Sequence, residues 1–128
     1  MRTLVVDDDA TSRFLLQEIL APYGEVHSCV DGIEAVEAFQ RSVDQGNPYQ
    51  LICLDIMMPL ASGIQALKKI RQCESGNANS QVRILMITAL KDHKTVTTSF
   101  REQCDGYLVK PINKADLLNH VRSFGLIA

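Results

Sequence analysis

The sequence predicts an α/β sandwich, in which a parallel sheet is packed between helices. Short apolar runs alternate five times with segments whose apolar residues recur at helical spacing. This strict alternation is typical of parallel strands joined by crossover helices. The third run, Leu51–Leu54, is apolar at every position, as expected for a central strand that is buried on both faces.

The five expected strands are brief, mostly aliphatic and bounded by polar or turn-forming residues. They cover Thr3–Val6, Val26–Cys29, Leu51–Leu54, Arg83–Ile87 and Tyr107–Val109. Two polar stretches rich in Gly, Asn, Pro and Ser, Val43–Gln50 and Cys73–Gln81, precede the third and fourth strands. We expect both stretches to be loops.

The expected helices follow the strands in turn. They cover Ala10–Leu20, Gly32–Ser42, Ile64–Gln72, His93–Glu102 and Lys114–Phe124. Asn113, with Asp116 three residues later, is typical of a helix start, and Gly125 suits the end of the last helix. Asp9 directly precedes the first helix, and we interpret it as the N-cap.

Length and charge limit the functional class. The 128 residues suit one domain, and 13 Lys and Arg against 15 Asp and Glu give a net charge of -2. This even balance argues against direct binding to nucleic acid or to a membrane surface. No apolar run approaches the roughly 18 residues that span a bilayer, and the first is too short for a signal peptide. We therefore expect a single cytoplasmic domain over residues 1–128.

The cysteines and histidines give no metal signal. No two cysteines form a Cys-x-x-Cys pair, so we expect reduced, mostly buried structural thiols at Cys29, Cys53, Cys73 and Cys104. The histidines have no partner at ligand spacing, and we assign no chemistry to His27, His93 and His120.

Polar side chains stand at the ends of four predicted strands. They are Asp7-Asp8-Asp9, Asp55, Thr88 and Lys110-Pro111. We expect the flavodoxin-like strand order 2-1-3-4-5 for this sheet. In that order the first, third, fourth and fifth strands, which carry these polar residues, are neighbours. Because functional groups of open α/β sheets lie beyond the carboxyl ends of the strands, these side chains should converge on one pocket.

The predicted pocket has the chemistry of a metal-assisted phosphoryl site. Two carboxylates about 4 Å apart repel by roughly 1 kcal/mol in water and about 4 kcal/mol at an effective dielectric of 20, so Asp7, Asp8 and Asp55 need a cation. An all-oxygen donor set favours Mg²⁺, or Mn²⁺, over zinc. Lys110 and Thr88 could contact a phosphoryl group, and a carboxylate that the metal does not fully occupy can attack phosphorus.

Four short motifs follow one another over essentially the whole chain. They are Leu4-Val5-Val6-Asp7-Asp8-Asp9, Leu54-Asp55-Ile56-Met57-Met58-Pro59 followed by Gly63, Ile87-Thr88-Ala89, and Asp105-Gly106-Tyr107-Leu108-Val109-Lys110-Pro111. Each motif alone is weak, but their combination is specific. Together, and in the expected order, they resemble the receiver domain of two-component response regulators, of which the single-domain chemotaxis regulator is the simplest member.

The resemblance implies a role for each acidic residue. Asp55 would become an aspartyl phosphate by accepting a phosphoryl group from the phosphohistidine of a histidine kinase or phosphotransfer protein. Asp8 would bind Mg²⁺ directly, and Asp7 would bind it directly or through water. The backbone carbonyl of Met57 would be a further ligand.

The resemblance also implies how phosphorylation is sensed. Lys110 and Thr88 would contact the phosphoryl group, and the small side chain of Ala89 would leave the acceptor accessible. Movement of Thr88 would let the ring of Tyr107 turn inward, although simple packing is an equally open interpretation of this tyrosine. The bond between Lys110 and Pro111 is expected to be cis.

Some positions depart from the family pattern. Met57 and Leu90 are apolar where polar groups often hasten hydrolysis of the acyl phosphate, so we expect a long-lived phosphoryl state. Gln103-Cys104 replaces the usual Gly-Ala, which changes the expected end of the fourth helix.

We expect a phosphoacceptor signalling protein that is not an enzyme and has no output domain. It would switch binding to a downstream protein through the face formed by helix 4, strand 5 and helix 5, as a monomer or a phosphorylation-dependent dimer. A phosphorelay shuttle and a receiver-like module that is not phosphorylated stay open as alternatives.

Two other classes fit the sequence less well. A flavin or nucleotide binder needs a phosphate cradle after the first strand, where Asp7-Asp8-Asp9 would repel a phosphate unless a metal intervened. A metal-dependent phosphohydrolase usually carries a second carboxylate two residues after the first, where this chain has Met57.

Overall fold

The computed structural model describes residues 1–56, 63–74, 81–89 and 104–128. The predicted strands and helices within these ranges are all present, with ends that differ by at most two residues. The predicted helix His93–Glu102 lies outside the described residues. The elements are β1 (Arg2–Val6), α1 (Ala10–Leu20), the 3₁₀ turn η1 (Ala21–Tyr23), β2 (Glu25–Cys29), α2 (Gly32–Asp44), β3 (Leu51–Asp55), α3 (Gly63–Glu74), β4 (Arg83–Thr88), β5 (Gly106–Val109) and α5 (Lys114–Ser123).

The strands form one parallel sheet in the order β2-β1-β3-β4-β5, which confirms the predicted topology. Val6 of β1 lies beside Leu54 of β3, and Asp55 lies beside Ile87 of β4. The residues that follow these strands therefore reach the same edge of the sheet at the same level.

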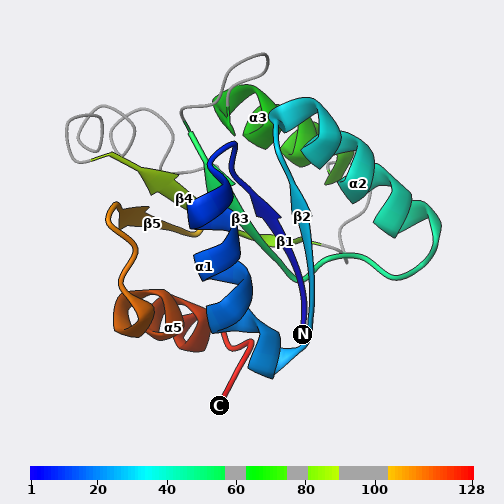
Figure 1. The fold of residues 1–128 in the computed structure, drawn as a ribbon. Coiled ribbons are helices and arrows are strands. Elements are labelled where there is room, and N and C mark those ends of the chain that lie inside the picture. The colour runs from blue at the N-terminus through cyan, green and yellow to red at the C-terminus, as the bar shows by residue number, and fades with distance from the viewer. Residues whose placement is uncertain (57–62, 75–80, 90–103) are drawn as a thin grey trace.

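Each face of the sheet packs its own apolar core, because successive strand residues point to opposite faces. Leu4 of β1 packs with Phe39 of α2 and Ile70 of α3 in one core. Its neighbour Val5 packs with α1 and α5, through Leu16 among others, in the second core. Accordingly, α1 and α5 cover one face, and α2 and α3 cover the other (Figure 1).

Short polar side chains fix the helix starts. Asp9 accepts hydrogen bonds from the Thr11 amide at 3.3 Å and the Ser12 hydroxyl at 2.9 Å, which confirms its predicted role as the cap of α1. Asn113 caps α5 in the same way. The cap of α2, Asp31, was not singled out from the sequence.

None of the described helices combines the length and hydropathy needed to cross a bilayer.

None of the four cysteines forms a disulfide, but the prediction that they are mostly buried needs a correction. Cys29 and Cys53 are buried, whereas Cys104 is half-buried and Cys73 is exposed on α3. Burial raises the pKa of the Cys53 thiol to about 12 and that of Cys29 to about 11, so both are protonated at neutral pH. Cys73 lies in the last turn of α3, where it lines a groove between α2 and α3 that is open to solvent.

Candidate functional site

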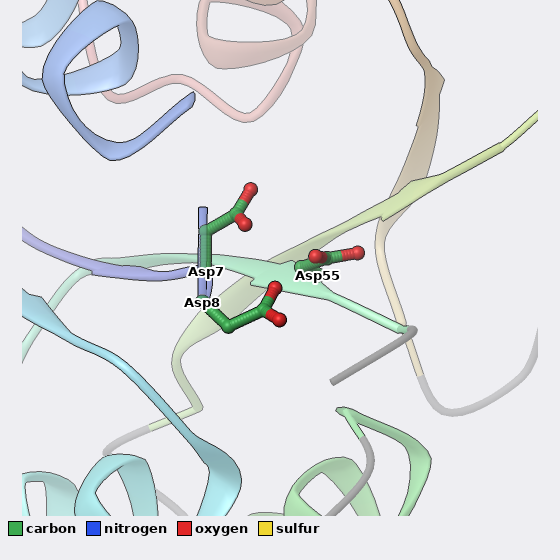
Figure 2. A group of neighbouring side chains, drawn as sticks. All are labelled: Asp7, Asp8 and Asp55. Atoms are coloured by element: carbon green, nitrogen blue, oxygen red, sulfur yellow. The ribbon is translucent and has the colours of Figure 1, made fainter. Parts of the chain in front are cut away.

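Three carboxylates meet at the carboxyl end of the sheet (Figure 2). Asp7 and Asp8 follow β1, and Asp55 ends β3. One oxygen from each residue lies within 4.8 Å of the others. The parallel register of β1 with β3 produces this convergence, since it brings two segments that are distant in the sequence to the same level.

The three carboxylates differ in their exposure to solvent. Asp7 is fully buried and Asp55 is 4% exposed, whereas Asp8 is exposed. Asp7 Oδ1 accepts a hydrogen bond from the Asp9 amide at 2.9 Å. Asp7 Oδ2 is buried and accepts no hydrogen bond within the described ranges. Burying a charged oxygen is costly, and the nearest positive charge that counters it is the Lys110 ammonium group.

Lys110 brings a positive charge into the cluster from the end of β5. Its Nζ lies 3.3 Å from Asp7 Oδ2 and 3.4 Å from Asp55 Oδ2. Burial lowers the pKa of Lys110, but the negative charges of Asp55 and Asp7 outweigh this effect, so the pKa is raised above its ordinary value. The ammonium group is therefore charged at neutral pH. The peptide bond to Pro111 is cis, the form expected from the sequence.

Thr88 and Ala89 stand beside the cluster at the end of β4. Thr88 is fully buried, and its hydroxyl donates a hydrogen bond to the Ala89 carbonyl at 3.1 Å. The Lys110 amide donates to the Thr88 carbonyl at 2.9 Å, which ties the ends of β4 and β5 together. Tyr107 lies on β5 beside Met86 and is half-buried against the apolar core. Its ring is thus packed in this structure, and the switch role is still a prediction.

Two predicted positions, Met57 and Leu90, lie outside the described residues. The carbonyl ligand assigned to Met57 and the phosphoryl lifetime assigned to both side chains therefore stay predictions.

The supporting roles of two residues near the site were not predicted from the sequence. Arg13 of α1 donates a hydrogen bond from Nη1 to the Asp7 carbonyl at 2.9 Å, which holds the end of β1 against α1. Gly63 begins α3 where an added Cβ would overlap the carbonyl oxygen of Asp55. Glycine thus lets α3 start directly against the end of β3. An isolated Arg or Gly gives no local sign of such long-range contacts.

The donor set fits a hard divalent cation. Carboxylate oxygens are the ligands that Mg²⁺ prefers, and it is usually held by one or two carboxylates together with water and phosphate. The described cluster contains three carboxylates and one ammonium group, so it carries excess negative charge. A divalent cation would balance this excess.

The comparison with protein families matches residues 3–122 to the response regulator receiver domain. Among similar proteins, the chemotaxis protein CheY of Halobacterium salinarum is 30% identical over 121 residues, covering 94% of this chain and 92% of that protein. The regulatory protein VanRB of Enterococcus faecalis is 37% identical over 127 residues, covering 96% of this chain and 51% of that protein. The chain thus spans about half the length of VanRB but nearly all of CheY.

Solved structures show the same fold. The response regulator TrrA of Thermotoga maritima, in complex with Mg²⁺ and BeF, is 31% identical with a TM-score of 0.77, covering 96% of this chain and 97% of that chain. In the CheX–CheY–BeF₃–Mg²⁺ complex of Borrelia burgdorferi, the matched chain is 28% identical with a TM-score of 0.78, covering 96% of this chain and 87% of that chain.

Proposed function

The chain belongs to the response regulator receiver domain family, and from this membership we propose that it accepts a phosphoryl group on Asp55 in a Mg²⁺-dependent reaction. The observation that supports the proposal best is the position of the Asp55 carboxylate. It lies within 4.8 Å of the carboxylates of Asp7 and Asp8 and 3.4 Å from the Lys110 ammonium group.

Asp55 is the carboxylate best placed to act as the nucleophile. Asp7 is fully buried, and one of its oxygens is held by the Asp9 amide, so a phosphoryl donor cannot reach it. Asp8 is exposed, and water would compete for its oxygens. Asp55 combines a small exposed fraction with a neighbouring positive charge.

The proposed reaction is a phosphoryl transfer from a phosphohistidine. An Asp55 oxygen attacks phosphorus, a P–O bond forms, the P–N bond to the imidazole breaks, and the histidine ring keeps that electron pair. The Lys110 ammonium group would contact the oxygens of the transferred phosphoryl group. The Thr88 hydroxyl donates a hydrogen bond to the Ala89 carbonyl in this structure, and it can rotate to donate to the phosphoryl oxygens instead. Mg²⁺ held by Asp7, Asp8, Asp55 and the Met57 carbonyl would neutralise charge on the phosphoryl oxygens.

The donor is proposed to be a histidine kinase or a phosphotransfer protein. Phe14 on α1 is 64% exposed, and Leu15 beside it is exposed as well. Because α1 begins directly after Asp9, these apolar side chains lie on the helix that borders the acidic cluster. They could bury apolar surface against the donor while its phosphohistidine reaches Asp55.

We further propose that the chain acts as a stand-alone cytoplasmic receiver, whose output is altered binding to a downstream protein through β5, α5 and the helix predicted at 93–102. The match over 92% of a CheY protein supports this proposal. A role as a phosphorelay shuttle is the alternative, because it needs the same chemistry at Asp55.

The chemistry can be tested by incubating the protein with acetyl phosphate and Mg²⁺ and measuring its intact mass. We expect the wild type to gain one phosphoryl group and Asp55→Asn to gain none, since an amide oxygen is a poor nucleophile. Asp44→Asn, an equal change at the exposed end of α2, is the matched control and should be labelled normally. Chelating the metal should suppress labelling. Equal labelling of Asp55→Asn, or no labelling of the wild type, would contradict the proposal.

A further inference from the structure

The helices α2 and α3 cover the face of the sheet that is opposite to α1 and α5 (Figure 1). Side chains of both helices line a groove between them. It encloses about 850 Å³. Val36 of α2 and Ala66 of α3 contribute apolar surface, and Ile33 lines the groove while 53% of it is exposed. A large aliphatic side chain left this open makes the groove a candidate contact surface.

The two sides of the groove carry opposite charges at the same height. Glu37 projects from α2 and Lys69 from α3, and both are exposed. Gln40 Nε2 lies 3.3 Å from Cys73 Sγ, which fixes the relative height of the two helices. Both helices follow parallel strands and run in the same direction, so Glu37, three residues before Gln40, is nearly level with Lys69. Neither charge makes an ion pair within the part of the chain that the structure describes.

We propose that α2 and α3 form a self-association surface, on which a second copy of this chain packs about a two-fold axis parallel to the groove. Rotation about such an axis keeps every residue at its height but exchanges the two sides. Glu37 of each copy then faces Lys69 of the other, so the complementary contact occurs twice.

The charges select this geometry over the other two-fold arrangement. An axis that lies across the groove would place α2 against α2 and α3 against α3, which brings Glu37 close to its own copy. Like charges placed opposite each other disfavour that arrangement. The single surface therefore complements itself in only one of these two orientations.

The size of the surface predicts a weak dimer. Helices of 13 and 12 residues are about 20 Å long, and two of them side by side are about 20 Å wide. The buried area would be about 400 Å² per copy, or about 800 Å² in total, which belongs to the range of weak, transient contacts. The surface lies away from α1, so dimer formation leaves the helix beside the acidic cluster uncovered (Figure 1). The proposal does not depend on phosphorylation.

Sedimentation velocity over about 10 µM to 1 mM covers the affinity expected for such an interface. We expect reversible dimer formation by the wild type. Glu37→Lys or Lys69→Glu alone should weaken it roughly tenfold or more, because each reversal replaces two attractive contacts by two repulsive ones. An equimolar mixture of the two variants should restore association as a heterodimer. The matched controls, Glu18→Lys on α1 and Lys114→Glu on α5, should associate like the wild type.

Three results would overturn the proposal. One is a wild type that stays monomeric throughout this range, which would leave the groove to a helix of another protein. Another is a mixture that associates no better than its separate components. The third applies if circular dichroism shows that the variants do not fold, in which case the dimer of the wild type is measured at rising NaCl concentration. The charge pairing predicts that salt weakens this dimer, so a dimer whose affinity does not change with NaCl would contradict the proposal.

Discussion

Both ends of the sheet carry clusters of carboxylates and cationic side chains, but the two clusters differ in how fully the carboxylates are paired with positive charge. At the carboxyl end, the ammonium group of Lys110 pairs with Asp7 and Asp55, and the third carboxylate, Asp8, makes no ion pair with the residues that the structure describes. At the amino end, the carboxylates of Glu74 and Asp105 are paired with the guanidinium groups of Arg71 and Arg83. One cluster is therefore short of positive charge, whereas the other is balanced.

The amino-terminal cluster also satisfies its hydrogen bonds. Arg71 contacts both Glu74 and Asp105, at 2.6 and 3.0 Å, and donates to the Val82 carbonyl at 2.9 Å. Asp105 Oδ2 in addition accepts from the Ile84 amide at 2.8 Å. The network joins the end of α3 to the starts of β4 and β5, and this is a structural role.

The contrast shows how a folded chain separates structural charges from functional ones. A carboxylate that has paired cations and backbone donors stabilises the fold, and it has little left to offer a ligand. A buried carboxylate without these partners costs stability in the absence of a ligand, which is typical of sites that bind or react. Substitutions at the two ends should therefore have opposite effects on stability.

The largest effect is expected at the balanced end. Asp105→Ala removes the partner of two arginines and the acceptor of the Ile84 amide, so it should lower the free energy of unfolding by about 3 kcal/mol. Urea denaturation measures this change, with Asp44→Ala on the exposed end of α2 as the control. A loss below about 1 kcal/mol would show that the network is not structural.

A smaller effect of opposite sign is expected at the acidic end. Asp8→Asn removes one of three mutually repelling charges, so it should raise the free energy of unfolding of the metal-free protein by about 1 kcal/mol at low salt. Added MgCl₂ should stabilise the wild type more than the variant, because the variant loses a ligand. Glu18→Gln, an exposed acid on α1, is the control. If Asp8→Asn is less stable than the wild type without metal, the two ends do not differ as described.

The smallest effect concerns alkaline pH. The pKa of Lys110 is raised, because the negative charges of Asp55 and Asp7 outweigh burial, which acts in the opposite direction. As a solvent-screened ion pair, charged Lys110 contributes about 0.5 kcal/mol to the free energy of unfolding. This contribution is fully present below the ordinary pKa of lysine, and it is lost as the pH rises through the raised pKa that Lys110 has in the folded protein. Wild type and Lys110→Met should therefore converge in stability from about pH 9 to pH 12, measured by urea denaturation. Lys114→Met, at an exposed lysine of α5, is the matched control for the substitution itself.

Features that depend on neighbours in the sequence could be predicted from the sequence alone. The apolar run Leu51–Leu54 identified the central strand, since only a strand buried on both faces can leave no polar position. Asp9 and Asn113 identified helix starts, because a cap bonds to an amide two or three residues away. The polar residues at the strand ends indicated the site, because parallel strands end at one edge of the sheet.

Features that depend on distant residues were decided by the tertiary structure. Arg71 meets Asp105, and Arg13 meets the Asp7 carbonyl, only after the sheet and its helices have packed. The height of Glu37 relative to Lys69 follows from the packing of α2 against α3. Local patterns report which face of an element is apolar, but the partner across that face is set by how whole elements pack. For this reason the sequence located the acidic pocket, whereas the charge balance at each end of the sheet emerged only from the folded chain.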